Sequence, residues 1–238
     1  MPQTPVVIVT GASSGIGRSA AEMLAERGFA VAMLARTASK LRETEEAIRQ
    51  RTPDASVLVL PTDVTDPGAV NVAVEAVLAD HGRIDAVVNA AGDAPLQPIE
   101  QITPELWRQC VDSNLSSVVY MTRCVWPTMK AQGSGTIINI SSLSSVDPFR
   151  GFNMYAAAKA GVNLFTHCTA DEGAEHGIKA VAIAPGAVET PMLRRNFGEK
   201  VLPPERTLNP DEIGWVICEC ITGDRAYVPG ETIQLLSP

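Results

Sequence analysis

Seven short apolar runs, separated by longer amphipathic stretches, dominate the pattern of hydrophobic and polar positions along this chain. The runs are VVIV from Val6, VAML from Val31, VLVL from Val57, IDAVV from Ile84, TIINI from Thr136, KAVAI from Lys179 and TIQLL from Thr232. They are apolar throughout rather than alternating, which is typical of strands that are buried on both faces of a parallel sheet. The pattern therefore predicts seven strands in one parallel sheet.

The stretches between the runs show the spacing of helices. Ile16, Ala20 and Leu24 share one helical face, and this stretch ends at Gly28. Further helices are predicted from Val70 to Gly82, from Leu106 to Met129 with an interruption near Pro127, and from Tyr155 to about Ala174. Strands that alternate with helices predict an α/β fold, a doubly wound sheet with helices on both faces in three layers.

Composition narrows the classes of protein that this chain can be. At 238 residues, with no linker rich in Pro, Gly or Ser, the chain suits one large domain spanning 1–238. A net charge of −8 provides no basic patch for nucleic acid. No apolar run reaches the roughly 18 residues that span a bilayer, and the N-terminal residues lack a basic signal-like region. We expect a cytoplasmic protein without membrane or nucleic-acid partners.

Metal chemistry finds no support in the sequence. The five cysteines form no C-x-x-C pair, and the three histidines are scattered. We expect reduced, mostly buried thiols and no metal site.

Candidate chemistry lies where the predicted strands end, because ligands of open parallel sheets bind beyond the carboxyl ends of the strands. TGASSGIG follows the first strand and contains Gly11, Gly15 and Gly17. Glycines in such a turn let the backbone approach a diphosphate at a helix N-terminus. The alternative is a tight turn that serves packing alone.

Two residues bear on the kind of dinucleotide. The second strand ends at Arg36, where a carboxylate would suit the ribose of NAD and an arginine suits the 2′-phosphate of NADP. Asp63 follows the third strand and is placed to meet an adenine. Arg36 could instead be a solvated residue at a helix entry, and Asp63 could be a turn residue.

The stretch MYAAAKAG places Tyr155 and Lys159 four residues apart, so both lie on one face of a helix. Ser142 follows the fifth strand, thirteen residues before Tyr155, and can converge on the same crevice. Taken alone, the pair could be an exposed amphipathic pair and Ser142 a turn residue.

Seven elements in register resemble the short-chain dehydrogenase/reductase family in its one-domain, Rossmann-type form, over nearly the whole chain. They are TGASSGIG, Asp63, NAAG at 89–92, Asn114 in DSNL, Ser142, Tyr155-x-x-x-Lys159 and the Pro185-Gly186 turn. Two departures are Ala90, where the family often has Asn, and the C-terminal end ETIQLLSP, which lacks the Asp-Gly-Gly of some members.

The resemblance implies an NADP(H)-dependent oxidoreductase that transfers hydride between nicotinamide and a carbonyl or secondary alcohol. Tyr155 would be the general acid or base, and Lys159 would move its pKa towards neutrality while binding the nicotinamide ribose. Ser142 would hold the carbonyl oxygen, and Asn114 would anchor a water that links Lys159 to solvent.

The cofactor site implied by the resemblance is extensive, and Arg36 favours NADP(H) over NAD(H). Its residues are Gly11, Ser13, Ser14, Gly15, Ile16, Gly17, Arg36, Asp63, Val64, Asn89, Ala90, Ala91, Gly92, Tyr155, Lys159, Pro185, Gly186, Val188 and Thr190.

Substrate contacts are expected from 143–152 and from a substrate loop at about 187–209. Arg194 and Arg195, among apolar neighbours, could close over an acidic or acyl-carrier-linked carbonyl, as in the family's 3-oxoacyl-[acyl-carrier-protein] reductases. They could equally be a solvated face, and Arg150 is open to the same two interpretations. The substrate and the physiological direction stay open.

Relatives of this kind pair their long helices across two-fold axes, which implies a homotetramer or a homodimer. The stripe of Ala158, Val162, Phe165 and Thr169 could form that contact or could pack against its own sheet. A non-catalytic NADP(H)-binding sensor is the alternative function on the same fold. The complete set of Asn114, Ser142, Tyr155 and Lys159 disfavours it, and the short C-terminal region disfavours epimerisation or dehydration.

Overall fold

The computed structural model describes residues 4–238; residues 1–3 of the expected 1–238 domain lie outside the described residues. The strands are β1 (Val6–Thr10), β2 (Ala30–Ala35), β3 (Val57–Pro61), β4 (Ala86–Asn89), β5 (Gly135–Ile140), β6 (Ile178–Pro185) and β7 (Thr232–Leu235). The α-helices are α1 (Gly15–Glu26), α2 (Ala38–Arg51), α3 (Pro67–His81), α4 (Pro104–Val111), α5 (Ser117–Gln132), α6 (Asn153–Gly173), α7 (Pro191–Asn196) and α8 (Pro210–Thr222). Short helical turns are η1 (Ile99–Gln101), η2 (Asp112–Ser116), η3 (Leu143–Ser145), η4 (Ala174–His176) and η5 (Pro204–Arg206).

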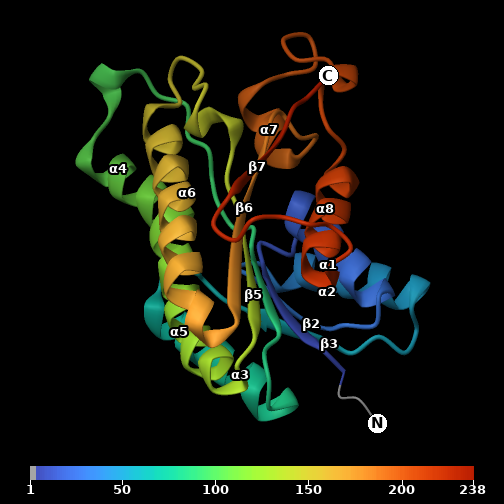
Figure 1. Cartoon of the computed structure of the whole chain (residues 1–238). Coiled ribbons are helices and arrows are strands. Elements are labelled where there is room, and N and C mark those ends of the chain that lie inside the picture. The colour runs from blue at the N-terminus through green and yellow to red at the C-terminus, as the bar shows by residue number, and fades with distance from the viewer. Residues whose placement is uncertain (1–3) are drawn as a thin grey trace.

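All seven predicted strands are confirmed, and they form one parallel sheet in the order β3-β2-β1-β4-β5-β6-β7. The order reverses at β1 and β4, which makes the sheet doubly wound and Rossmann-like. In Figure 1 the helices α3, α5 and α6 lie on one side of the sheet and α1, α2 and α8 on the other, so the predicted three layers are confirmed.

The expectation that every strand is buried on both faces holds for five of the seven and is wrong for the two edges. The central strands are almost wholly inaccessible to solvent, whereas β3 and β7 are half-buried. An edge strand has a neighbour on one side only, so solvent reaches its backbone and part of its side chains. The apolar runs do not show the order of the strands in the sheet, so they do not show which strands lie at its edges.

The long helix predicted from Leu106 to Met129 is interrupted at a different place from the one expected. Pro127 lies inside α5 and does not end it. Pro127 and Arg123 are both exposed, so water can bind the carbonyl that loses its helical partner there. The break is instead η2, a π-helical segment that joins α4 to α5 and contains Asn114.

The carboxyl ends of the strands all point towards the end of the sheet where α7 is seen in Figure 1. After β6 the chain makes an excursion that closes where Val188 pairs with Leu208 in a short parallel bridge. The Glu189 N–H donates to the Leu208 carbonyl at 2.9 Å and the Leu208 N–H to the Ala187 carbonyl at 2.8 Å. Among residues 4–238, no helix is long and apolar enough to span a membrane.

Candidate active site

Tyr155 and Lys159 lie one turn apart near the start of α6, as their spacing predicts. The Lys159 Nζ atom lies 5.6 Å from the centre of the Tyr155 ring. The same Nζ donates a hydrogen bond of 2.8 Å to the carbonyl of Ile140, the last residue of β5. Lys159 is only 4% exposed, so this bond fixes a buried cation against the end of the strand.

The pKa of the Tyr155 phenol moves in the direction opposite to the one expected from a neighbouring ammonium. Burial raises it to about 12, and a hydrogen bond with Ser142 acts in the lowering direction. Burial also lowers the pKa of Lys159 to about 8. Removing a charge from water disfavours the charged form of either group, and this effect is the largest cause of both shifts in pKa. The neutral phenol is therefore the form that this environment favours.

Ser142 lies at the turn between β5 and η3, within reach of the Tyr155 phenol. Its Oγ accepts a hydrogen bond from the Ser144 N–H at 3.2 Å, and the Ser144 hydroxyl lies 3.0 Å away. Ser144 is buried and was not singled out from the sequence. Because these contacts occupy the acceptor side of Ser142, its own O–H remains able to donate.

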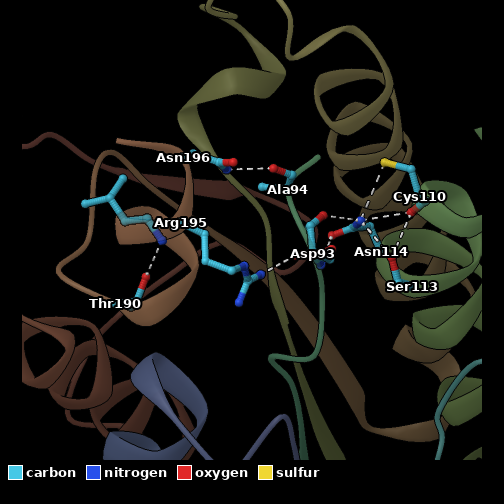
Figure 2. A network of polar contacts seen from close by, with 9 residues as sticks. Asp93, Ala94, Cys110, Ser113, Asn114, Thr190, Arg195 and Asn196 are labelled. Carbon is cyan, nitrogen blue, oxygen red and sulfur yellow. Dashed lines mark hydrogen bonds and ion pairs between the residues drawn. The ribbon is translucent and has the colours of Figure 1, made fainter. Parts of the chain in front are cut away.

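Asn114 is fully buried in the π-helical η2, where Figure 2 shows it between Asp93 and Cys110. Its Nδ2 donates to the Asp93 carbonyl at 2.7 Å and to the Cys110 carbonyl at 2.8 Å. Its Oδ1 accepts from the Asp93 N–H at 3.3 Å. The amide is thus held on both sides by the segment that follows NAAG, and its orientation is fixed.

The glycines form a cradle that side chains would fill. A Cβ atom at Gly11, whose φ is +69°, would lie 2.9 Å from the Ala91 nitrogen, and one at Gly17 would lie 2.5 Å from the Gly11 carbonyl oxygen. A Cβ at Gly15 would meet Thr190 at 2.9 Å, and one at Gly92 would meet the Asn114 Oδ1 at 2.6 Å. The close approach of these segments fits a nicotinamide dinucleotide, whose diphosphate needs bare backbone.

The first turn of α1 begins in this cradle. Ser14 is its N-cap, but the Ser14 side chain makes no capping hydrogen bond, and the first turn carries no acidic residue. The N–H groups there are free to meet an anion. Ser13 stands in the same turn, whereas Ile16 is half-buried and packs on the core behind it.

Arg36 follows β2 and Asp63 follows β3, and the two opposite charges interact. Arg36 is exposed and forms no hydrogen bond or ion pair with any residue of 4–238, so its guanidinium is available. The Asp63 Oδ1 accepts from the Thr65 N–H at 3.0 Å and from its hydroxyl at 2.8 Å. The Thr65 N–H is the main cause that lowers the pKa of Asp63, with Arg36 contributing. Asp63 thus makes a turn contact through its Oδ1, and Val64 beside it is buried in the core.

The NAAG segment is held by side chains that sequence reasoning did not assign. The Asn89 side chain is buried and donates to the Asn139 side chain at 2.9 Å. The N–H groups of Ala90 and Ala91 each donate to the Thr10 hydroxyl at 3.1 Å. Thr10 belongs to the TGASSGIG stretch, and its hydroxyl at a strand end was the signal that could have identified it.

The residues after β6 close the far side of the crevice. The Gly186 N–H donates to the Leu235 carbonyl at 2.8 Å, which extends the pairing of Pro185 in β6 with β7. The Thr190 hydroxyl caps α7 by accepting from the Leu193 N–H at 3.2 Å and lies 3.2 Å from the Val188 carbonyl. The Thr190 side chain also lies beside Gly15, where a Cβ would come within 2.9 Å of it, so the segment after β6 adjoins the glycine-rich turn.

Arg194 and Arg195 of the 187–209 loop form contacts within the protein. Arg194 forms an ion pair with Glu189 and donates to the Leu202 carbonyl at 2.7 Å. Arg195 lies 2.5 Å from the Asp93 carboxylate. The Arg194 side chain is half-buried, whereas the Arg195 side chain is 61% exposed; Arg150 is exposed and has no ion pair among residues 4–238.

Within residues 4–238, no cluster of His, Cys, Asp and Glu could hold a metal ion. Of the five cysteines, Cys110, Cys218 and Cys220 are buried, Cys124 is half-buried and Cys168 is exposed. Burial raises the pKa of the Cys110 thiol to about 11, so it is a packed neutral group beneath Asn114.

The fold and the site define the class to which the chain belongs. Residues 5–200 match the short chain dehydrogenase family. The chain is a member of the short-chain dehydrogenase/reductase family of oxidoreductases. Acetoacetyl-CoA reductase from an Acinetobacter species is 31% identical over 241 residues, which cover 99% of this chain and 97% of that protein.

Two solved structures resemble this chain over almost its full length. One is a variant of actinorhodin polyketide ketoreductase with NADPH, at a TM-score of 0.91 and 29% identity, covering 98% of this chain and 96% of that one. The other is 3-ketoacyl-(acyl-carrier-protein) reductase from Brucella melitensis complexed with NADH, at 0.89 and 28%, covering 98% and 97%.

Proposed function

We propose that this protein is an NADP(H)-dependent carbonyl reductase in which Tyr155 is the proton donor. The observation that carries the proposal is the convergence of the Tyr155 phenol with Ser142 and with the Lys159 ammonium at the end of β5. A sensor has no need of a proton donor at this place. We further propose that 1–238 works as one dinucleotide-binding and catalytic domain, with 187–209 as its substrate loop.

The chain's own groups have separable tasks. Bound NADPH supplies the hydride. The Ser142 O–H donates to the carbonyl oxygen and orients it, and Tyr155, whose pKa is raised to about 12, delivers the proton to that oxygen. Lys159, with a pKa lowered to about 8, can pass a proton between the phenol and solvent near neutral pH. Asn114, fixed by Asp93, would position the water that completes this path.

The preference for NADP(H) rests on Arg36. An arginine rather than a carboxylate at the end of β2, with no ion pair among residues 4–238, suits a 2′-phosphate, and the glycine cradle with the first turn of α1 suits the diphosphate. The ketoreductase relative with NADPH supports the preference, although the Brucella relative was crystallised with NADH. Tyr155 and Lys159 would meet the nicotinamide ribose.

Assembly and location follow the family resemblance. A groove lined by Val119, Trp126 and Phe165 lies between α5 and α6 and is open to solvent in one copy. Of the apolar stripe on α6, Ala158 and Val162 are buried within the chain, whereas Phe165 and Thr169 line this groove. We propose a cytoplasmic homotetramer or homodimer; light scattering of the purified protein distinguishes the two.

The experiment measures NADPH and NADH oxidation against ketones, quinones, 3-oxoacyl thioesters and sugar ketones. The proposal expects consumption of NADPH, faster than of NADH, with at least one class and formation of the matching alcohol. Cofactor binding without turnover of any compound would favour the sensor and count against the reductase.

A further inference from the structure

Three aromatic rings continue from the Tyr155 ring to the molecular surface. The Phe152 ring centre lies 5.5 Å from that of Tyr155, and the Phe197 ring meets Phe152 edge-on at 5.9 Å. Phe149 lies 6.1 Å from Phe152 and 6.4 Å from Phe197. These separations are those of favourable aromatic pairs. We call Phe149, Phe152 and Phe197 the aromatic wall.

The aromatic wall is built from two segments that the sequence places far apart. Phe149 and Phe152 precede α6, whereas Phe197 follows α7 in the 187–209 loop. The two residues before Phe197 hold that loop in place, because Arg195 pairs with Asp93 and Asn196 donates to the Ala94 carbonyl at 2.7 Å. Figure 2 shows both contacts crossing to the segment that contains Asp93 and Ala94. Phe197 is therefore held against Phe152 beside the candidate proton donor.

The burial of the wall changes along its length. Phe152 is 8% exposed, Phe197 is half-buried and Phe149 is 68% exposed. A ring as exposed as Phe149 leaves much apolar surface in contact with water, at the outer end of the rings that continue from Tyr155. A flat apolar group bound against these rings would remove that surface from water.

The contacts of the arginines Arg194 and Arg195 in the 187–209 loop also favour an uncharged apolar group. Arg194 is occupied by Glu189 and by the Leu202 carbonyl, and Arg195 by Asp93, so neither offers a free guanidinium to an anionic substrate. Arg150 is exposed next to Phe149, at the outer end of the wall rather than beside Tyr155. The Phe152 ring packs on the Tyr155 ring, and Arg194 and Arg195 are each paired with a carboxylate.

From these contacts we propose that the aromatic wall selects carbonyl compounds whose reacting carbon is attached to, or is part of, a planar apolar ring. The proposal rests on the proposed reductase function and names its substrate class. Phe197 is the specificity-determining residue of the wall, because it comes from the substrate loop and packs on both other rings. Acyclic 3-oxoacyl thioesters, which present a flexible chain at the same place, would be poorer substrates.

A matched pair of neutral probes tests the ring directly. Ethyl benzoylacetate and ethyl acetoacetate are both 3-oxo esters, and they differ in a phenyl or a methyl group on the reacting carbonyl. Burying a phenyl ring is worth enough to lower the KM of the benzoyl ester at least roughly ten-fold below that of the acetyl ester. Acetoacetyl-CoA serves as the anionic acyclic competitor.

Variants of the wall separate a role in specificity from a role in folding. Phe197→Ala should lower kcat/KM for ethyl benzoylacetate roughly two- to twelve-fold, mainly through KM, which is the range that one aromatic contact supports. Its effect on ethyl acetoacetate should stay within about two-fold, and Phe197→Tyr should restore the preference. Phe149→Ala should show the same selectivity at a position too exposed to threaten the core. Trp215→Ala removes a comparably exposed ring on α8 and should change neither ester.

The outcomes distinguish the two proposals. Turnover of acetoacetyl-CoA in preference to both esters, or an equal effect of Phe197→Ala on both, would overturn the ring preference and leave the reductase intact. If no carbonyl is reduced, the reductase proposal fails, and calorimetric titration of ethyl benzoylacetate into the NADP⁺-loaded protein still tests the wall. Binding that weakens in Phe197→Ala and Phe149→Ala supports the wall as a ring site; no binding, or binding unchanged in both variants, overturns it.

Discussion

The carboxylate of Asp93 lies 2.5 Å from the guanidinium of Arg195, although 102 residues separate them in the chain. The backbone of Asp93 binds the Asn114 side chain through both its N–H and its carbonyl. One residue thus joins the candidate proton path to the 187–209 loop, and the position of that loop is tied to the segment that holds Asn114.

Arg195→Ala should remove the ion pair with Asp93 and destabilise the protein only slightly. Both side chains of the pair are more than half exposed, so the free energy of unfolding should fall by less than about 1 kcal/mol. The KM of the carbonyl substrate should rise several-fold because the loop is no longer held, and high salt should raise it in the wild type as well. Steady-state kinetics at low and high salt measure both effects.

The matched control is Arg108→Ala, which breaks the exposed pair between Arg108 and Glu105 on α4. Its stability should change by the same small amount, with no change in KM. An equal rise in KM in both variants would remove the Asp93 contact from the account.

Comparing Gly11→Ala with Gly28→Ala distinguishes the effect of backbone strain on stability from the effect of a Cβ on cofactor binding. Both glycines have positive φ, +69° and +81°, so alanine should cost about 1–2 kcal/mol of stability at Gly28 and more at Gly11, where the Cβ also clashes with backbone. Only at Gly11 would a Cβ meet another segment of the candidate cofactor site, 2.9 Å from the Ala91 nitrogen; at Gly28 nothing lies within 4 Å. Fluorescence titration should show weakened NADPH binding in Gly11→Ala alone, and equal affinities would contradict the cradle.

Arg36→Asp should weaken NADPH binding at least ten-fold while leaving NADH binding nearly unchanged. Hydrogen bonds between charged groups are worth about 1.5–3 kcal/mol, and the new carboxylate would repel a 2′-phosphate. Arg108→Asp on α4 changes the net charge by the same amount and should not alter the preference. Should Arg36→Asp leave the ratio of the two dissociation constants unchanged, Arg36 does not select the cofactor.

Lys159 gives the stability of the protein a defined dependence on pH. Burial lowers its pKa from the ordinary 10.5 to about 8, so between these values the unfolded chain holds the proton that the folded chain releases. The free-energy cost of burying the Lys159 charge is fully present below pH 8 and decreases as the pH rises from about 8 to 10.5. The raised pKa of Tyr155 acts with the opposite sign, but only above its ordinary value of 10.0.

The prediction concerns the difference in stability between wild type and Lys159→Met. Relative to the variant, the wild type should gain about 2 kcal/mol between pH 7 and pH 9.5. Urea denaturation at the two pH values measures this difference. Lys179→Met, at an exposed position of β6, is the control and should show no such gain. A difference that is constant with pH would mean that Lys159 keeps an ordinary pKa.

Features that depend on residues close together in the chain could be predicted from the sequence. Features that depend on contacts between distant segments could not. Apolar runs located every strand, and spacing alone placed Tyr155 and Lys159 on one helical turn. The exposure of β3 and the contact of Asp93 with Arg195 depend on strand order and loop path, which no local pattern records. The raised pKa of Tyr155 was missed because burial, not the neighbouring charge, dominates it.

Turnover of NADPH by Tyr155→Phe tests the central claim most directly. Phenylalanine keeps the ring that packs on Phe152 and removes only the phenol oxygen. The account predicts that carbonyl-dependent oxidation of NADPH falls by at least a hundred-fold, the lower range for loss of a general acid, while the dissociation constant of NADPH stays within about two-fold. Oxidation at a near-normal rate by a variant that still binds NADPH would contradict the role of Tyr155 as proton donor.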